Sequence, residues 1–216
     1  MNEIVIDKIQ NSDFNEVADI LTDAFLTNPA YSLIFKNKNR RKEGLLWLFK
    51  ANLFIINEKK ALTNIVKDKK TSEIIGTYTL IPPNGINSSI STYLKVNIPR
   101  FILKFGTNAL FRMLILDGIN KKTLKKAIKT SDFYYLSMVA IRREYRRKGI
   151  GSEMINCAVR ELVSLPLACN LVGLTTQLPE NKTFYSRLGF VSLDEGCIDF
   201  KKDKYYNYNM TLNVLK

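Results

Sequence analysis

The sequence predicts a mixed α/β fold, in which a central sheet of about seven strands is flanked by helices. The chain has 216 residues, of which 46% are hydrophobic and 11% aromatic, so it can bury the core of a globular domain. Segments with the period of a strand alternate with segments of helical period. Residues 132–177 have the order strand, helix, strand, which is that of a βαβ unit. We therefore expect a single domain over residues 1–216.

The first half of the chain is expected to combine helices with a hairpin. Residues 3–9 have the pattern of a strand, and the apolar side chains of residues 14–25 share one helical face. Pro29 interrupts that pattern, and a second helix is expected over residues 40–57. Two strands then form a hairpin that ends at Pro82. They cover residues 61–68 and 72–81.

The second half is expected to begin with a basic helical segment. The pattern from Ser91 to Thr130 is helical, with breaks expected near Gly106 and Gly118. The run DFYYLSMVAI at residues 132–141 is largely apolar, which is typical of a strand that is buried on both faces. The remaining elements are a helix over 149–164, a strand over 170–177, a short helix over 180–188, and strands over 190–198 and 205–214.

The composition excludes several kinds of chemistry. The chain has no histidine, which removes Ser-His and Cys-His nucleophiles and every histidine metal site. Its three cysteines, Cys157, Cys169 and Cys197, lack the paired spacing of a metal site, so we expect buried free thiols and no metal. The amino terminus has no signal-peptide core, and no apolar run is long enough for a transmembrane segment. We therefore expect a soluble cytoplasmic protein.

Much of the formal net charge of +13 lies in one segment of the chain. Residues 91–130 carry nine cations against the single acid Asp117. Lysine-rich segments are commonly the solvated faces of helices. A positive segment also suits an acidic acceptor, a membrane surface or nucleic acid, and the sequence leaves these alternatives open.

A glycine loop, RRKGIG at residues 146–151, directly follows the central strand and opens the next helix. Its two glycines let the backbone approach a ligand closely, and the free N–H groups of the first helical turn could hold a phosphate there. The chain has no Walker A motif, and Met154 stands where a dinucleotide-binding fingerprint has its third glycine. The residues alone therefore leave a phosphate site and a structural turn as alternatives.

The stretch VAIRREYRRKGIGSEMI resembles the acetyl-CoA-binding motif of the GNAT superfamily of acetyltransferases, with Arg146, Gly149 and Gly151 at the fixed positions. TTQLPENKTFYSRLGF is similar to a later motif of that family, and VADILTDAFLTNPAYSLIF is similar to its substrate-side helices. Arg143 departs from the pattern, because many members have proline at that position. The resemblance implies the GNAT fold with a βαβ acetyl-CoA-binding core and a helical substrate-side insertion over residues 83–130.

The resemblance also implies a site for acetyl-CoA as cosubstrate, without a metal. Backbone groups of the central strand, at Met138, Val139 and Ile141, would pair with the pantetheine arm like an extra strand. Asn181 would contact the cofactor, although a helix N-cap explains that asparagine nearly as well. The glycine loop would bind the pyrophosphate. The implied loop residues are Arg146, Arg147, Lys148, Gly149, Ile150, Gly151 and Ser152.

Acyl transfer needs an acid for the departing thiolate, a donor to the carbonyl oxygen, and a neutral amine. By resemblance Tyr185 is the general acid, and packing of its helix on the sheet is the alternative role. By resemblance the central strand is bulged, and a backbone N–H of the bulged strand near Met138 or Val139 would meet the carbonyl oxygen. No residue stands out as the general base, since Asp132 could act directly or through a water, or could be a turn residue.

The resemblance therefore implies an N-acetyltransferase that moves the acetyl group of acetyl-CoA directly to a primary amine of a small molecule or protein. If the basic segment lined the acceptor site, it would repel polyamines and aminoglycosides and favour neutral or acidic acceptors. The alternative is an inactive CoA-binding module with a basic surface for nucleic acid or an anionic membrane. Leu124 and Ile128 lie at core spacing among the lysines, which disfavours nucleic acid. The sequence leaves a homodimer open.

Overall fold

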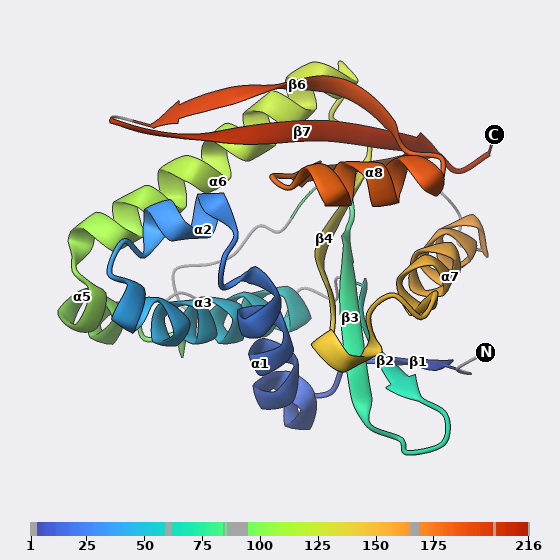
Figure 1. The fold of residues 1–216 in the computed structure, drawn as a ribbon, viewed down its shortest axis with the longest axis horizontal. Coiled ribbons are helices and arrows are strands. Elements are labelled where there is room, and N and C mark those ends of the chain that lie inside the picture. Colours follow the sequence, from blue (N-terminus) through green and yellow to red (C-terminus); the bar gives the residue numbers. More distant parts are fainter. Residues whose placement is uncertain are drawn as a thin grey trace.

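The computed structural model describes residues 4–58, 62–83, 85, 95–164, 169–200 and 202–215, and Figure 1 shows their fold. The strands are β1 (Ile4–Lys8), β2 (Leu62–Asp68), β3 (Ile74–Ile81), β4 (Tyr134–Ile141), β5 (Leu171–Thr176), β6 (Val191–Phe200) and β7 (Asp203–Asn213). They form one seven-stranded sheet in the order β1-β2-β3-β4-β5-β7-β6. β4 and β5 are parallel, and the other neighbours are antiparallel. The predicted mixed α/β class is confirmed.

Helices cover both faces of this sheet (Figure 1). One face packs against α1 (Phe14–Phe25), α2 (Pro29–Ile34), α3 (Lys38–Glu58), α5 (Ile98–Phe105) and α6 (Thr107–Ile128). The other face packs against α7 (Ile150–Ser164) and α8 (Pro179–Arg187). Short 3-10 turns precede α1 and α7, at η1 (Asn11–Asp13) and η2 (Arg143–Tyr145). β4, α7 and β5 form the predicted βαβ unit at the centre of the sheet.

Strand β4 changes the face to which its side chains point. Tyr134 and Leu136 belong to the apolar cluster on the α7 side, whereas Met138 and Ala140 belong to the cluster on the α1 side. Residues an even number apart normally share one face of a sheet, so the strand contains an extra residue. The register with β3 shifts at this point, and Met138 has a φ of 48°. Strand β4 therefore has a β-bulge in its middle.

The parallel strands β4 and β5 separate along their length. Their pairing is confined to Tyr134 opposite Val172 and Tyr135 opposite Gly173. Beyond Tyr135, the edge of β4 on the β5 side pairs with none of the described strands. A gap in the hydrogen-bonded sheet thus opens next to the bulge.

The basic helical segment is more continuous than the sequence indicates. The break at Gly106 is confirmed, since α5 ends there and this glycine has a φ of 82°. The break expected near Gly118 is wrong, because α6 passes through it without interruption. One exposed glycine costs a helix only about 1 kcal/mol, and buried side chains such as Leu116 and Leu124 hold α6 on the core. Residues 91–94 of the expected segment lie outside the described part of the chain.

Pro29 begins a helix that the sequence did not predict. The side-chain oxygen of Asn28 accepts hydrogen bonds from the backbone N–H groups of Ala30 at 3.0 Å and Tyr31 at 3.4 Å. A proline at the first helical position loses no hydrogen bond, because that N–H would have no partner in the helix. The asparagine cap and the proline together therefore start α2 directly after α1.

The three cysteines are all unpaired, as expected. Cys157 and Cys169 are only partly buried and Cys197 is exposed, however, so the expectation of buried thiols is wrong. None of the described helices is long and apolar enough to cross a lipid bilayer. The described residues also hold no group of three or more acidic or cysteine side chains arranged for a metal ion.

Candidate active site

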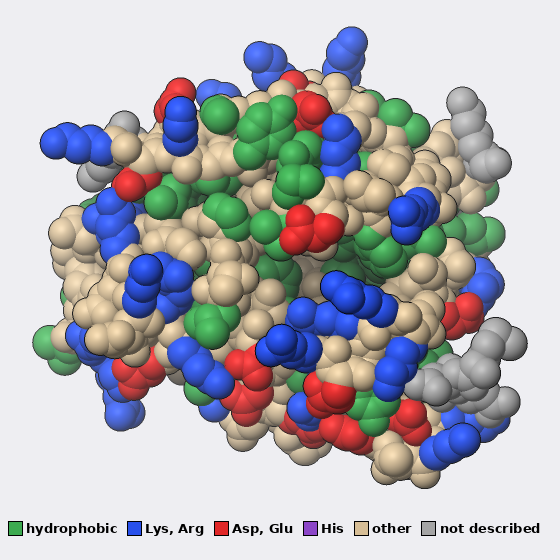
Figure 2. All heavy atoms as spheres, viewed as in Figure 1, with side chains coloured by type: hydrophobic (Ala, Val, Ile, Leu, Met, Phe, Trp, Pro, Cys, Tyr) green, Lys and Arg blue, Asp and Glu red, His purple; other side chains and the backbone are tan. Residues whose placement is uncertain are grey.

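A cavity lies where β4 and β5 separate. Its volume is about 350 Å³, and residues 135–139 of β4 and 174–176 of β5 line it. Asn181 and Tyr185 of α8 border the same space, which continues toward α1, α2, α3 and α6. Figure 2 shows the surface hollowed between α8 and the turn before α7, with Lys and Arg side chains gathered next to that turn. The later motif thus supplies Asn181 and Tyr185 to this cavity and the first motif supplies Val139, whereas none of residues 146–152 lines it.

The unpaired edge of β4 can bind an extended ligand. Its N–H and C=O groups beyond Tyr135 have no partner strand in the described part of the chain, so a ligand could pair with them as an added strand. Met138 and Val139 line the cavity at the bulge, whereas Ile141 does not. Ile141 pairs with Gly76 of β3 instead. Of the three strand residues implied by the motif, two therefore lie at the wall of the cavity.

The glycine loop presents backbone amides at the start of α7. Glu153 N donates to Gly149 O at 3.1 Å, so the amides of Ile150, Gly151 and Ser152 precede the first hydrogen bond of the helix. Gly149 has a φ of 81°, a conformation that L side chains rarely adopt. A Cβ at Gly151 would lie only 3.3 Å from the Phe184 ring. The backbone conformation at Gly149 and the close packing at Gly151 therefore explain why glycine occupies both positions. The free amides form a site of the kind that binds phosphate groups.

The three cations before the first glycine have different surroundings. Arg146 Nε donates to the Ile141 carbonyl at 3.0 Å, so this side chain fastens the loop to the end of β4. Lys148 Nζ lies 5.1 Å from the centre of the Tyr145 ring, and Arg147 is exposed with a φ of 61°. Arg147 and Lys148 are consequently better placed than Arg146 to move toward an anion.

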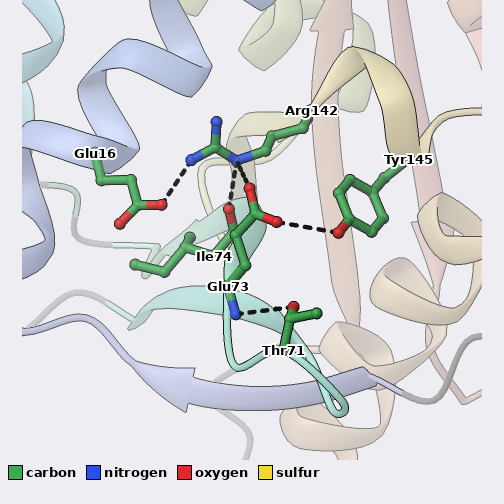
Figure 3. Close-up of polar contacts among 6 residues, drawn as sticks. All are labelled: Glu16, Thr71, Glu73, Ile74, Arg142 and Tyr145. Carbon is green, nitrogen blue, oxygen red and sulfur yellow. Dashed lines mark hydrogen bonds and ion pairs between the residues drawn. The ribbon is translucent and has the colours of Figure 1, made fainter.

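Arg142 connects the glycine loop to two distant elements, as Figure 3 shows. Its Nη2 donates to Glu16 of α1 at 2.6 Å, and its Nε donates to the Ile74 carbonyl at 2.6 Å and lies 3.3 Å from Glu73 Oε1. The Tyr145 hydroxyl donates to the other carboxylate oxygen of Glu73 at 3.1 Å. The hairpin of β2 and β3, helix α1 and the turn before α7 are thus held in one relative position. Sequence analysis did not identify this network.

Tyr185 combines the two roles that the sequence left open. It is 8% exposed and packs edge-on against the rings of Phe184 and Phe190, as a residue of a packed helix face would. It also lines the cavity. Burial, and secondarily the nearby Tyr135, raise the pKa of its hydroxyl above the ordinary value. The hydroxyl therefore stays protonated at neutral pH and can donate a proton into the cavity.

Asn181 lies in the first turn of α8 and lines the cavity close to Tyr185. Its side-chain nitrogen donates to the Thr176 hydroxyl at 3.1 Å. The alternative role as N-cap is wrong, because Leu178 is the N-cap residue of this helix. The hydrogen bond to Thr176 therefore fixes the side-chain amide of Asn181, and the oxygen of that amide does not cap the helix.

The acidic side chain at the cavity is Asp117, not Asp132. Asp132 is exposed in a turn, where its backbone N–H donates to the Thr130 hydroxyl at 3.1 Å, and it does not line the cavity. Asp117 of α6 does line it, and its Oδ2 lies 2.7 Å from Lys121 Nζ. The sequence offered a signal for Asp117, because it is the single acid of the basic segment.

Most cations of the basic segment point away from the cavity. Of the described charged residues there, only Asp117 and Lys121 line it. Lys95 and Lys104 form ion pairs with Glu58 and Glu43 of α3. The segment therefore lines the cavity mainly with uncharged side chains, and Lys121 is its one cation among the described lining residues. Four further lysines gather at the end of α6, namely Lys122, Lys125, Lys126 and Lys129.

A chain of amide side chains fixes the far wall of the cavity. Asn28 Nδ2 donates to Gln177 Oε1 at 3.0 Å, and Gln177 Nε2 donates to Asn207 Oδ1 at 2.8 Å. Asn207 Nδ2 in turn donates to Asn209 Oδ1 at 3.1 Å. Asn28 and Gln177 line the cavity. The start of α2 is thus tied to the end of β5 and to the middle of β7, and sequence analysis did not identify these residues either.

The separated parallel strands, the bulge and the glycine loop that opens α7 are features of the GNAT fold. Residues 117–192 match the family model of the acetyltransferase (GNAT) domain. No curated protein matches the chain by sequence.

Solved structures show that the whole chain has this fold. A Corynebacterium glutamicum protein, described as histone acetyltransferase HPA2 and related acetyltransferase, is 19% identical with a TM-score of 0.62, over 96% of this chain and 94% of that chain. Spermidine N-acetyltransferase from Vibrio cholerae, solved with CoA and spermine, is 14% identical with a TM-score of 0.57 over 100% of both chains. Arylalkylamine N-acetyltransferase 2 from Aedes aegypti is 11% identical with a TM-score of 0.61, over 99% of this chain and 100% of that chain.

Proposed function

We propose that the protein is an acetyl-CoA-dependent N-acetyltransferase, which transfers the acetyl group directly to a primary amine of a small molecule or protein. The observation that carries the proposal is the single cavity that joins the open edge of β4, the hydroxyl of Tyr185 and a pocket among α1, α2, α3 and α6. Two proteins of similar structure are named for the acetylation of amines, spermidine in one and arylalkylamines in the other.

The residues present suit each part of acetyl-CoA. The amides of Ile150, Gly151 and Ser152 would bind the pyrophosphate at the positive end of α7, with Arg147 and Lys148 as counter-charges. Backbone groups at Met138 and Val139 would pair with the pantetheine arm along the gap in the sheet. Asn181 would contact the arm from α8.

Acetyl-CoA supplies an activated thioester, so that a C–N bond forms to the amine and the C–S bond breaks. A backbone N–H at the bulge would donate to the carbonyl oxygen as negative charge develops there. The Tyr185 hydroxyl would donate its proton to the departing sulfur, and its raised pKa keeps that proton available. The amine loses its own proton to solvent, which requires no base among the residues of the cavity.

We also propose that the protein works in the cytoplasm. All three of its cysteines, Cys157, Cys169 and Cys197, are unpaired thiols. Unpaired thiols are usual where the cellular environment is reducing.

A second function is supported by the surface of α6. Lys122, Lys125, Lys126 and Lys129 surround a shallow depression, and Phe111 is 61% exposed on the same helix. A CoA-binding module without catalysis could use this surface to bind an anionic membrane or nucleic acid. Sedimentation with anionic vesicles or DNA at low and raised salt tests this, because electrostatic binding weakens as salt screens it.

Titration calorimetry with acetyl-CoA tests the main proposal. The native protein is expected to bind, and a variant carrying Gly149→Glu and Gly151→Glu is expected to lose binding while its circular dichroism stays native. The added carboxylates would occupy and repel the phosphate site. Absence of binding by the folded native protein would remove the enzyme proposal and leave the lysine surface of α6 as the better supported site.

A further inference from the structure

The solvent side of α5 and α6 carries a group of exposed apolar side chains. Phe111, Leu114 and Ile115 are 61%, 56% and 44% exposed, and their spacing of three and four residues places them next to one another on α6. Leu103, on the preceding helix α5, is 89% exposed. Single exposed apolar residues are common on soluble proteins, whereas a group of neighbours is typical of a surface that binds a protein or a membrane.

The same side of α6 continues as a row of lysines. Lys122 and Lys129 follow Ile115 at intervals of seven residues, about two helical turns, so they extend the face that carries the apolar side chains. Four lysines surround the shallow depression at this end of the helix, namely Lys122, Lys125, Lys126 and Lys129. None of the four forms an ion pair with an acidic side chain in the described part of the chain. Their positive charge is therefore available to an anionic partner.

An anionic lipid surface suits both halves of this face. Apolar side chains enter the boundary between headgroups and acyl chains, while lysines beside them bind the negative headgroups. Nucleic acid would pair with the lysines, but leucine and isoleucine offer its bases no ring for stacking. A second copy of this chain, with a formal net charge of +13, would bring a positive surface against the lysines. Charge and apolarity together therefore favour lipid over both alternatives.

The position of this face leaves the candidate active site accessible. Leu114 and Lys121 line the cavity and are also exposed, so the cavity reaches the surface along one edge of the face. The glycine loop lies at the start of α7, which packs on the opposite face of the sheet from α5 and α6 (Figure 1). A lipid surface at α5 and α6 would thus lie beside the cavity and leave the loop free.

We propose that α5 and α6 dock the protein on an anionic lipid surface. Phe111, Leu114 and Ile115 enter the lipid, and the four lysines at the end of α6 bind the headgroups. Docking is compatible with acetyl transfer, because it covers neither the glycine loop nor the whole of the cavity. It does not depend on that transfer, so the inference goes beyond the proposed function and is tested without an acceptor amine.

Sedimentation with vesicles of defined composition provides the first test. The protein is expected to bind vesicles of equal parts phosphatidylcholine and phosphatidylserine much more strongly than vesicles of phosphatidylcholine alone, because the lysines need a negative surface. Raised salt should weaken the binding, since it screens the charges. Equal binding to both kinds of vesicle, or to neither, would overturn the inference.

Variants with the two lysines replaced test the basic half of the face. Lys125→Gln combined with Lys126→Gln should lower the partition of the protein onto the anionic vesicles about tenfold or more, because each lysine near the surface contributes to binding. Lys70→Gln combined with Arg187→Gln is the matched control. It changes the net charge equally, at exposed positions in the β2–β3 turn and at the end of α8. An equal loss in both double variants would show a general charge effect and contradict docking through α6.

Variants with apolar residues replaced test the other half. Phe111→Ser combined with Ile115→Ser should also lower the partition about tenfold, because two apolar side chains no longer enter the lipid. Val163→Ser combined with Leu193→Ser removes two exposed apolar side chains from α7 and β6 and should bind as the native protein does. Circular dichroism checks that each variant is folded. Native partition in a folded Phe111→Ser, Ile115→Ser variant would exclude insertion of α6 and overturn the inference.

Three further results would assign the surface to a different partner and overturn the inference. One is stronger binding to duplex DNA than to the anionic vesicles, lost in the lysine variant alone. Another is a dimer in solution that dissociates in the Phe111→Ser, Ile115→Ser variant. The third is release of the protein from vesicles by acetyl-CoA, which would place the lipid at Arg147 and Lys148 of the glycine loop. Calorimetry with acetyl-CoA tests the proposed function separately, so that either proposal can fail while the other stands.

Discussion

The Tyr145 hydroxyl donates a hydrogen bond of 3.1 Å to Glu73 Oε2, and this contact joins the turn before the glycine loop to the β2–β3 hairpin. Glu73 also lies 3.3 Å from Arg142 Nε through its other carboxylate oxygen. Neither Glu73 nor Tyr145 lines the cavity, so they can affect the loop without touching the acceptor. Their contact therefore offers a way to change binding of the cofactor alone.

Tyr145→Phe removes this hydrogen bond and keeps the ring under Lys148. We expect KM for acetyl-CoA to rise about three- to tenfold, because the loop then spends part of its time in conformations that do not bind. The value of kcat should change little, since the reacting groups stay in place. Steady-state kinetics with varied acetyl-CoA provide the measurement.

Two comparisons give this first prediction its specificity. Tyr206→Phe removes the hydroxyl of a half-exposed tyrosine on β7 and should leave both constants unchanged. The double variant with Glu73→Gln and Tyr145→Phe should raise KM for acetyl-CoA by less than the two single changes combined, because both break the same contact. Equal KM values for acetyl-CoA in native protein and Tyr145→Phe would refute a positioning role.

Gly149→Ala tests the left-handed backbone at the glycine loop. No atom lies within 4 Å of the added Cβ, so the change introduces backbone strain without a clash. At a φ of 81° that strain should lower the free energy of unfolding by about 1 kcal/mol, and acetyl-CoA should bind more weakly. Denaturant unfolding and calorimetry measure the two effects.

Gly118→Ala is the matched control for the glycine loop. Gly118 is exposed in the middle of α6, and a Cβ there would meet nothing within 4 Å. Alanine should stabilise the protein by about 0.5–1 kcal/mol and leave acetyl-CoA binding unchanged. If Gly149→Ala were as stable and bound as tightly as Gly118→Ala, the special backbone of the loop would have no consequence.

The general-acid role of Tyr185 predicts a loss of rate with a defined pH dependence. Tyr185→Phe keeps the packing against Phe184 and Phe190 and removes the proton, so kcat should fall about a hundredfold. Because the pKa of the tyrosine is raised, the proton stays on the hydroxyl beyond the usual value near ~10. In the native protein kcat should therefore not decline between neutral pH and about 10, within the range in which the fold is stable.

Tyr134→Phe is the control for the general acid. Tyr134 is also buried on β4, at 7% exposure, but it does not line the cavity. Its substitution should leave kcat within about twofold of native, because surrounding contacts of the ring persist. A Tyr185→Phe variant with native kcat would leave Tyr185 only its packing role.

The sequence alone predicts the parts of the site whose residues are contiguous. The loop at 146–151 and the helix with Tyr185 each carry their signal within about ten positions, and the strand-helix-strand order places them at the same sheet. The bulge at Met138 is implied by the resemblance alone, because the strand itself carries no such signal. Both faces of β4 are covered by helices and take apolar side chains, so the alternation that would show an extra residue is absent.

Long-range contacts explain most of what the sequence did not predict. Arg142 binds Glu16 across 126 positions and Ile74 across 68, and no local pattern links such residues. Asp117 is visible as a lone acid, but helical periodicity does not tell which face of α6 turns toward a cavity formed by other elements. Gly118 was expected to break a helix because propensity was weighed without the packing of Leu116 and Leu124, which overrides it.

The amide chain from Asn28 to Asn207 should contribute strongly to stability. Gln177→Leu has a similar volume, but it leaves Asn28 Nδ2 and Asn207 Oδ1 without their partner in a region where both asparagines are buried. An unsatisfied buried polar group costs about 1–3 kcal/mol, so the free energy of unfolding should fall by at least that amount. Urea unfolding followed by circular dichroism measures the change.

The same substitution should also impair the acceptor side of the cavity more than the cofactor side. Gln177 holds the start of α2, which carries Tyr31 into the cavity, whereas the glycine loop lies on the other face of the sheet at α7. We expect KM for the acceptor amine to rise while the affinity for acetyl-CoA stays native. Asn156→Leu is an exposed change on α7. It should change the free energy of unfolding by no more than about 0.5 kcal/mol and leave KM unchanged. A loss of acetyl-CoA affinity in Gln177→Leu equal to the loss for the amine would show that the two sides of the cavity are not independently held.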